Sequence, residues 1–292
     1  MLLSALLQDP TLFVPVIALL GLVVGSFLNV VIHRVPLMMD RQWRTECQSL
    51  LCPDGETPLK EEAPFSLSFP PSHCPKCQHT IRVWENIPVL SYVALRGRCA
   101  ACKQRISARY PVVEILTAAL SVVLAFEIGP SIELLAFLGL TWTLIALALI
   151  DFDTQLLPDS MTLPLVWAGL VVNALLGVVS LEDALWGAVA GYLSLWSIFW
   201  VFKLLTGKEG MGYGDFKLLA ALGAWMGWQA LPMIIVMSSL VGALFGITLI
   251  IVRGRDRNIP IPFGPYLATA GWLVMIWGDT ISRWYLDYAG IQ

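Results

Sequence analysis

Two aspartates lie where apolar stretches of the chain meet polar loops, and their surroundings are typical of catalytic carboxylates. Asp215 ends the glycine-rich stretch GMGYGD at residues 210–215, and glycines leave room for another backbone to approach closely. Asp151 follows an unbroken apolar run at residues 144–150. A carboxylate at the edge of a membrane-embedded segment is expensive, and it is a functional hypothesis by default.

Together the two carboxylates would support peptide hydrolysis. Two carboxylates held close in a partly dry site cannot both ionise easily, so they share a proton and offer one base and one acid. The base can activate a water molecule while the acid protonates the scissile carbonyl oxygen. The sequence contains neither the HExxH motif of zinc proteases nor the GxSxG motif of serine hydrolases. These observations favour an aspartyl protease over the other hydrolase classes.

Each acidic residue of these regions also has a structural interpretation. An aspartate before an apolar helix most often caps that helix by accepting hydrogen bonds from its first N–H groups, and this applies to Asp215. Asp159 follows Pro158, so we expect it to cap the next helix. Asp153 is expected to be solvated at the membrane interface. The local sequence alone leaves both the capping and the catalytic role open for Asp215.

Four cysteines form two CxxC pairs that predict a zinc site. Cys74 and Cys77 are followed, after 21 intervening residues, by Cys99 and Cys102. Four thiolates satisfy tetrahedral Zn²⁺ with no open position, so such a site is structural. Two disulfides are the alternative, and they require an oxidising compartment. The remaining cysteines and the flanking histidines, interpreted as reduced thiols and surface residues, are Cys47, Cys52, His73 and His79.

The composition is that of an integral membrane protein. The chain of 292 residues is 57% hydrophobic and only 13% charged, against about 25% charged in soluble domains, and its mean hydropathy is +0.74. A membrane span needs about 20 mainly apolar residues, and the sixth candidate is short for a full crossing. The eight candidate spans cover residues 11–32, 110–128, 131–150, 160–179, 183–205, 216–228, 230–252 and 264–286.

The basic residues predict how these spans are oriented. Eleven of the 18 lysines and arginines lie between residues 33 and 109. If the N-terminus is outside, 17 of the 18 fall on one side of the membrane or at its boundary, and that side is the cytoplasm by the positive-inside rule. Asp151 and Asp215 then lie on the same cytoplasmic face. The cysteines lie in a reducing compartment, which favours zinc over disulfides.

The sequence closely resembles the type IV prepilin peptidases, which are bifunctional leader peptidases and N-methyltransferases. The GxGD stretch is also similar to that of the presenilin and signal peptide peptidase type of intramembrane aspartyl protease. The resemblance runs almost end to end and is carried by the two CxxC pairs, GSFLNVV at 25–31, RYP at 109–111 with Glu114, IDFDTQLLPD at 150–159, GYGDFK at 212–217 and PFGPY at 262–266.

The resemblance implies roles for residues at these positions. Asp151 and Asp215 become the catalytic pair, and the four cysteines become zinc ligands. Gly212 and Gly214 are expected to shape the loop that presents Asp215. Lys217 would tune the carboxylates, although a lysine at a membrane boundary often only extends its amine to water. Glu114 would pair with a basic group of the polar loop or support the site.

The resemblance also implies a substrate and a cofactor. Family members cut prepilins and the pseudopilins of type II secretion after the glycine that ends a short basic leader. They then methylate the new N-terminal amine with S-adenosylmethionine. No GxGxxG motif follows a predicted strand, so the sequence does not place the methyl-donor site, and the cytoplasmic loop is a hypothesis for it. Expected partners are these substrates and membrane lipid, without nucleic acid.

The expected architecture is therefore an all-α polytopic protein of the bacterial inner membrane, with eight transmembrane helices and a small cytoplasmic zinc-ribbon-like domain between helices 1 and 2. Residues 1–32 would form the first transmembrane helix, 33–109 the four-cysteine zinc-binding domain and 110–292 a seven-helix membrane aspartyl protease domain. The active site and zinc domain would face the cytoplasm. The proline-rich segment at 260–265 is expected to lie near the carboxylate pair or to be a plain connection.

Two other classes of protein remain alternatives. A transporter would use Asp151 and Asp215 to bind a cation or relay protons, but the sequence shows no internal repeat with paired broken helices. A membrane scaffold would use the cysteine module to bind a partner. Only the peptidase requires both aspartates to act on one peptide bond.

Overall fold

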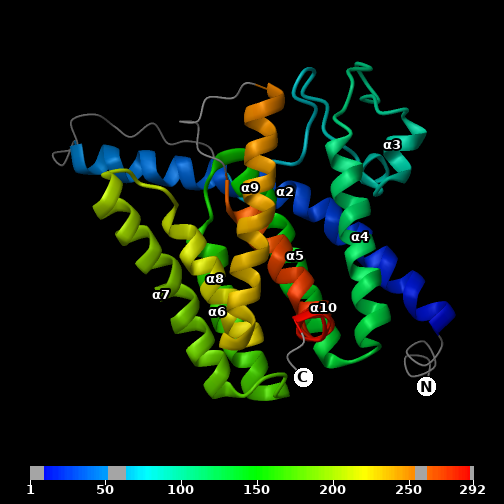
Figure 1. Cartoon of the computed structure of the whole chain (residues 1–292). Coiled ribbons are helices and arrows are strands. Elements are labelled where there is room, and N and C mark those ends of the chain that lie inside the picture. Colours follow the sequence, from blue (N-terminus) through cyan, green and yellow to red (C-terminus); the bar gives the residue numbers. More distant parts are fainter. Residues whose placement is uncertain (1–9, 52–63, 254–261, 290–292) are drawn as a thin grey trace. The chain divides into compact units, whose positions relative to one another are not determined.

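The structure, a computed structural model, describes residues 10–51, 64–253 and 262–289. In this part of the chain the regular elements are helices, joined by two isolated β-bridges in a polar segment. The all-helical prediction is therefore confirmed. The chain divides into two compact units, Met1–Pro130 and Ser131–Gln292, and each unit is a self-contained set of packed helices (Figure 1).

Unit 1 contains a long helix, a cysteine-bearing segment and a second membrane-length helix. The elements are α2 (Pro10–Leu51), η1 (Val83–Asn86), α3 (Leu90–Ala94) and α4 (Arg109–Ile128). Helix α2 has 42 residues and continues well beyond the predicted span at 11–32. Hydropathy marks only where the apolar part ends, whereas the polar residues that follow contain no glycine and stay helical.

Helices α2 and α4 pack through a GxxxG motif. A Cβ atom added at Gly21 would lie 2.6 Å from the Cα of Ala118, and one added at Gly25 would lie 2.7 Å from the Cα of Glu114. Small residues at this spacing are how membrane helices bring their backbones close, because lipid provides no hydrophobic force between them. Asn29 extends the contact by donating a hydrogen bond to the carbonyl of Tyr110 at 3.1 Å.

In its described residues, 131–253 and 262–289, unit 2 is a bundle of six helices and one short 3₁₀ turn. Ser131 and Ser180 start α5 and α7 by accepting hydrogen bonds from the N–H groups of Leu134 and Asp183. Helix α7 ends at Thr206, and the next residue, Gly207, caps it with a positive φ of 70° that suits a glycine. The elements are α5 (Ile132–Thr154), α6 (Asp159–Leu176), α7 (Leu181–Thr206), α8 (Tyr213–Met226), η2 (Trp228–Ala230), α9 (Leu231–Arg253) and α10 (Gly264–Ala289).

Helix α8 is the centre of unit 2. It packs against α6, α7 and α10 (Figure 1), and its residues from Asp215 to Trp225, apart from Lys217, are buried. Gly187 of α7 faces Gly223 of α8 so closely that a Cβ atom on either would collide with the backbone carbonyl of the other. A helix apolar on all sides is one that is enclosed by its neighbours.

Asn173 of α6 binds the C-terminal end of α8. Its buried amide donates to the carbonyls of Ala224 at 2.9 Å and Trp225 at 3.2 Å. Its side-chain oxygen accepts a hydrogen bond from the N–H of Val179 at 3.0 Å. The last carbonyls of a helix have no partner within the helix. The buried asparagine therefore donates hydrogen bonds to helix-end carbonyls that lipid could not satisfy.

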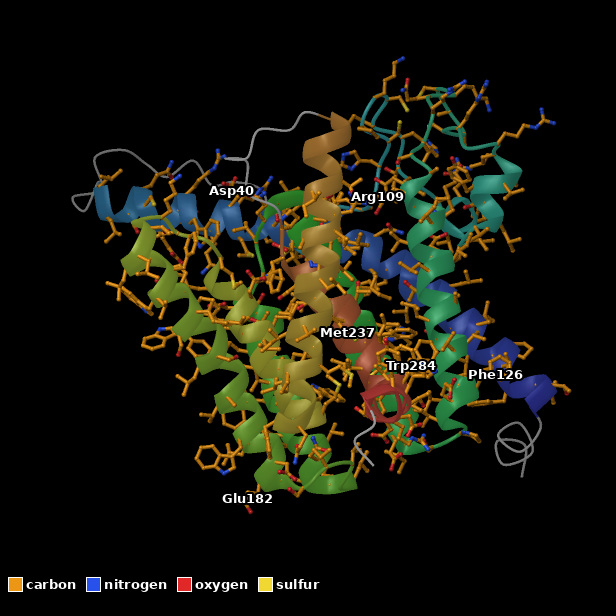
Figure 2. All side chains as sticks on the ribbon, viewed as in Figure 1. Asp40, Arg109, Phe126, Glu182, Met237 and Trp284 are labelled. Atoms are coloured by element: carbon orange, nitrogen blue, oxygen red, sulfur yellow. The ribbon has the colours of Figure 1, made fainter. Side chains whose placement is uncertain are left out.

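Six helices of the described residues are long and apolar enough to cross a membrane. Two of the eight predicted spans, 216–228 and 264–286, correspond to α8 and α10, which are not among the six. With 14 residues, α8 is about 21 Å long at 1.5 Å per residue, shorter than the hydrocarbon core of about 30 Å. The outward faces are apolar, as at Phe126 on α4, which is 70% exposed (Figure 2).

The contact between α7 and α8 predicts that Gly187→Leu destabilises the protein. The new side chain has to displace the backbone of α8, and overpacking of this kind costs about 1–3 kcal/mol or more. The thermal unfolding midpoint of the purified protein in detergent should fall. Gly139→Leu is the matched control, because a Cβ atom at Gly139 meets nothing within 4 Å. Equal midpoints for the two variants would contradict the close helix contact.

Candidate active site and candidate metal centre

The two predicted catalytic aspartates lie together in unit 2. Asp151 belongs to the last turn of α5, and Asp215 belongs to the first turn of α8. Both side chains are buried, at 5% and 6% exposure. Their carboxylates are close enough to interact electrostatically. Antiparallel neighbours in the bundle bring the end of one helix beside the start of another, and this places two residues 64 positions apart at the same site.

Asp151 is oriented by the start of α10. The N–H of Gly264 donates a hydrogen bond to Oδ2 of Asp151 at 2.9 Å. A Cβ atom at position 264 would lie 2.7 Å from the same oxygen, so only glycine allows this approach. Gly264 belongs to the proline-rich segment expected near the carboxylates; Pro260 and Ile261 of that segment lie outside the described residues. The glycine between two prolines was a signal for this donor, but the sequence did not reveal its partner.

Asp215 lies in the first turn of α8, and one of its two carboxylate oxygens has no hydrogen-bond partner among the described residues. Gly212 is the N-cap residue of α8, and Asp215 is the third residue of the helix. The backbone N–H of Gly212 faces the carboxylate, so the aspartate contributes to the helix start without being the cap itself. Among the described residues, Oδ1 of Asp215 is buried without a hydrogen-bond partner. A buried polar atom in that state is costly and calls for a functional explanation.

The loop between α5 and α6 is braced against the glycine-rich stretch. A Cβ atom at Gly214 would lie 2.5 Å from Cβ of Leu157. Lys217 forms an ion pair with Asp159, with Nζ and Oδ1 2.5 Å apart. Lys217 thus binds the carboxylate at the start of α6 and is not paired with Asp151 or Asp215 in the structure. The expectation that Asp159 caps α6 is wrong, because Pro158 holds the N-cap position and the Asp159 carboxylate turns to Lys217.

The four predicted zinc-ligand cysteines converge in unit 1. The Sγ atoms of Cys74, Cys77, Cys99 and Cys102 all lie within 4.8 Å of one another. The separations are 3.8 Å for Cys74 and Cys102 and 3.9 Å for Cys77 and Cys99. Zinc–sulfur bonds of about 2.3 Å in a tetrahedron place the sulfurs about 3.8 Å apart. The cluster therefore has the donor set and size that a metal ion of this kind needs, and its cysteines are free thiols.

The two CxxC pairs form matching turns. In the first, the N–H of Gln78 donates to the carbonyl of Cys74; in the second, that of Lys103 donates to Cys99. Gln78 and Lys103 both have positive φ, at 58° and 60°. The backbone N–H groups of Cys77 and then Lys76 face the Cys74 thiolate and lower its pKa to about 6. A thiolate is the form that binds metal.

Glu114 supports the cysteine-bearing segment through a backbone contact. Its carboxylate accepts a hydrogen bond from the N–H of Val89 at 2.8 Å. Val89 has a positive φ of 59°, which is unusual for a branched residue. The expected basic partner is not what Glu114 binds. Glu114 and the cysteines belong to unit 1, whereas both aspartates belong to unit 2.

Other polar residues of unit 1 are tied into the same segment. His79 lies 3.0 Å from the carboxylate of Glu85. The N–H of Arg82 and then this histidine hold the pKa of Glu85 below its ordinary value. Arg34 of α2 is buried and donates to the carbonyls of Ser66 and Pro70 at 2.8 and 2.5 Å. Of the two cysteines expected as plain thiols, Cys47 is exposed on α2, and Cys52 lies outside the described residues.

Comparisons with known proteins match both units. Residues 19–128 match the Bacterial Peptidase A24 N-terminal domain, and residues 138–247 match the Type IV leader peptidase family. The chain is 59% identical over 277 residues to the prepilin leader peptidase/N-methyltransferase of Aeromonas hydrophila, with 95% of each chain covered. It is 55% identical over 291 residues to the protein of that name from Pseudomonas aeruginosa, covering 100% of this chain and 99% of the relative.

A third relative of the same name, from Neisseria gonorrhoeae, is 50% identical over 280 residues, covering 94% of this chain and 95% of the relative. No solved structure matches. The matches span nearly the whole chain and include the residues of both candidate sites. The chain belongs to the type IV leader peptidase family.

Proposed function

We propose that this chain cleaves the leader peptide from prepilins and type II secretion pseudopilins, and then N-methylates the new N-terminal residue. The observation that carries the proposal is the pair of buried carboxylates at the ends of α5 and α8. The relatives' name, prepilin leader peptidase/N-methyltransferase, supports the substrate and both reactions. The catalytic residues in this proposal are Asp151 and Asp215.

The mechanism follows from two carboxylates that share a proton. The ionised partner accepts a proton from water as the water attacks the scissile carbonyl carbon, and the protonated partner donates to the carbonyl oxygen. The N–H of Gly264 keeps the Asp151 carboxylate in a fixed orientation. The unpartnered Oδ1 of Asp215 is available to a water molecule or to the substrate carbonyl. The enclosing helices exclude bulk water, which strengthens these interactions.

The neighbouring residues act on the geometry of this pair. In the proposal Gly214 allows the loop before α8 to pass close to Leu157, and Gly212 and Gly214 leave room for the substrate backbone. Lys217 affects the catalytic pair indirectly, because its ion pair with Asp159 holds the start of α6 against the start of α8. Glu114 shapes the segment that carries the cysteines.

We propose that the site faces the cytoplasm of a bacterial inner membrane. The basic residues Lys203, Lys208 and Lys217 lie on the same end of the bundle as both aspartates, which the positive-inside rule assigns to the cytoplasm. In this topology α8 and α10 join the six membrane-length helices as the two further predicted spans. Residues 33–109 then form a cytoplasmic zinc-binding module, and 110–292 supply seven membrane segments.

We propose zinc as the metal of the cysteine cluster. Four thiolates leave no position for a substrate or water, so the ion would hold the two turns together and take no part in hydrolysis. S-adenosylmethionine would supply the methyl group for the second reaction. We assign its pocket to the cytoplasmic segment of unit 1 and derive no step of methyl transfer from individual side chains.

Replacing either aspartate tests the peptidase directly. Asp151→Asn and Asp215→Asn should each lower the cleavage rate of a prepilin by about 10²–10⁴-fold or more, because an amide serves neither as base nor as acid. Asp153→Asn should cleave normally, since that side chain is exposed beside the site. The measurement is mass spectrometry of prepilin incubated with each folded variant. A transporter or scaffold would leave the prepilin intact with every variant, including wild type.

Removing a thiolate tests the metal centre. Purified wild-type protein should contain one zinc ion per chain, and Cys77→Ser should lose it because three thiolates no longer close the tetrahedron. Elemental analysis by mass spectrometry measures the content. Cys47→Ser is the control, because Cys47 lies on α2 and is not one of the clustered cysteines. Zinc that is absent from wild type, or retained in Cys77→Ser, would rule out the assignment.

A further inference from the structure

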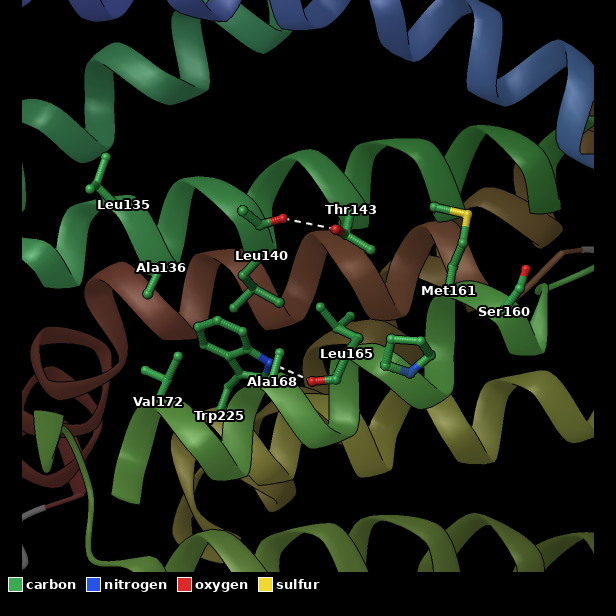
Figure 3. A pocket seen from close by; sticks show the side chains of 12 residues that line it. Leu135, Ala136, Leu140, Thr143, Ser160, Met161, Leu165, Ala168, Val172 and Trp225 are labelled. Atoms are coloured by element: carbon green, nitrogen blue, oxygen red, sulfur yellow. Dashed lines mark hydrogen bonds between the residues drawn. The ribbon is translucent and has the colours of Figure 1, made fainter. Parts of the chain in front are cut away.

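A groove of about 500 Å³ opens between α5 and α6 in unit 2 (Figure 3). Ala136, Gly139 and Thr143 line it from α5, Met161 and Ala168 line it from α6, and Trp225 of α8 forms its base. The lining is predominantly apolar. The hydroxyl of Thr143 is already satisfied, because it donates to the carbonyl of Gly139 at 2.8 Å.

The groove is built into the packing of the three helices. Trp225 holds α6 onto α8, since its indole N–H donates to the carbonyl of Leu165 at 2.9 Å and its ring lies against Gly169. On the facing wall of α5, the small residues Ala136 and Gly139 lie between Leu135 and Leu140. A Cβ atom at Gly139 would meet nothing within 4 Å, so the space in front of it is open.

One end of the groove lies toward the carboxylate pair. Thr143 and Asp151 are eight residues apart on α5, which is about two turns or 12 Å along the helix. Met161 follows Asp159, whose carboxylate binds Lys217 at the start of α8. Figure 3 shows Ser160 and Met161 at one end of the groove and Leu135 and Ala136 at the other. The groove therefore runs from the site end of the bundle toward the opposite end.

We propose that this groove binds the apolar helix of the peptide substrate while its polar end is cut. A peptide that reaches carboxylates at the ends of apolar helices continues into hydrocarbon, where its backbone has to be helical to satisfy its own polar groups. Ala136, Gly139 and Ala168 in the lining of the groove let such a helix approach closely. The proposal rests on the proposed peptidase function and adds where the substrate lies.

Filling the groove tests this placement. Gly139→Leu should fold, because its side chain enters open space, and it should lower kcat/KM for a membrane-inserted prepilin by about tenfold, since remote binding energy is lost. Ala174→Leu is the matched control, because Ala174 is exposed on α6 and does not line the groove. Rates are measured in detergent or liposomes by mass spectrometry of the released leader. Cleavage by Gly139→Leu at the wild-type rate would overturn the groove proposal.

Cross-linking supplies a readout that does not depend on turnover. In an Asp151→Asn background with a mild oxidant added, Ala168→Cys should form disulfides with prepilins that carry a cysteine at positions three or four residues apart along the apolar helix. Ala174→Cys should form none of these. A groove filled only by lipid or by a second copy of this chain would give no cross-link to prepilin at any position. That result would also overturn the proposal. A wild-type protein that leaves prepilin uncut would instead overturn the proposed function itself.

Discussion

The enclosure of α8 by its neighbours is the constraint on which unit 2 depends. Lipid offers no hydrophobic gain for bringing helices together, so close backbone contact and satisfied polar groups have to provide the association. The contact of Gly187 with Gly223 supplies the first, and the amide of Asn173 on the last carbonyls of α8 supplies the second. A helix of only 14 residues can then lie inside the bundle without lipid contact along most of its length.

The placement of the carboxylates follows from this enclosure. Because α8 is short and buried, its first turn holds Asp215 inside the bundle, beside the end of α5. Asp151 meets a backbone N–H of α10 instead of a cation. A fixed dipole orients a carboxylate without neutralising its charge, whereas a lysine in that place would compete for the proton. Lys217, at the start of α8, forms an ion pair with Asp159 at the exposed edge.

Unit 1 is held by different means. Its polar segment buries few apolar side chains, and Val83, Trp84 and Val93 are exposed. The fold of residues 64–108 therefore depends on two matching turns, a four-thiolate cluster and buried polar contacts. Glu114 on α4 and Arg34 on α2 bind backbone groups of this segment from the two helices below it. A metal ion bound to the cluster would add folding free energy where a hydrophobic core cannot.

The sequence by itself determined the features that depend on local pattern. Composition indicated a helical membrane protein, and CxxC spacing indicated the thiolate cluster. The apolar run before Asp151 and the glycine-rich stretch before Asp215 indicated the acidic candidates. Predicted helix ends were less accurate where a polar sequence continues a helix. An example is α2, which remains helical to Leu51 although its apolar part ends near residue 32. The domain division that groups residues 110–128 with the later helices stays a prediction. Sequence did not indicate that α4 packs on α2, which Gly21 and Gly25 allow by close contact.

Only the tertiary structure decided which groups meet. The Gly264 N–H on Asp151, the ion pair of Lys217 with Asp159 and the contact of Glu114 with Val89 join residues far apart in the chain. No local pattern encodes such partners, because they depend on how whole helices pack. The open space at Gly139 has the same origin, since a glycine in a helix looks identical in sequence whether another backbone fills its face or nothing does.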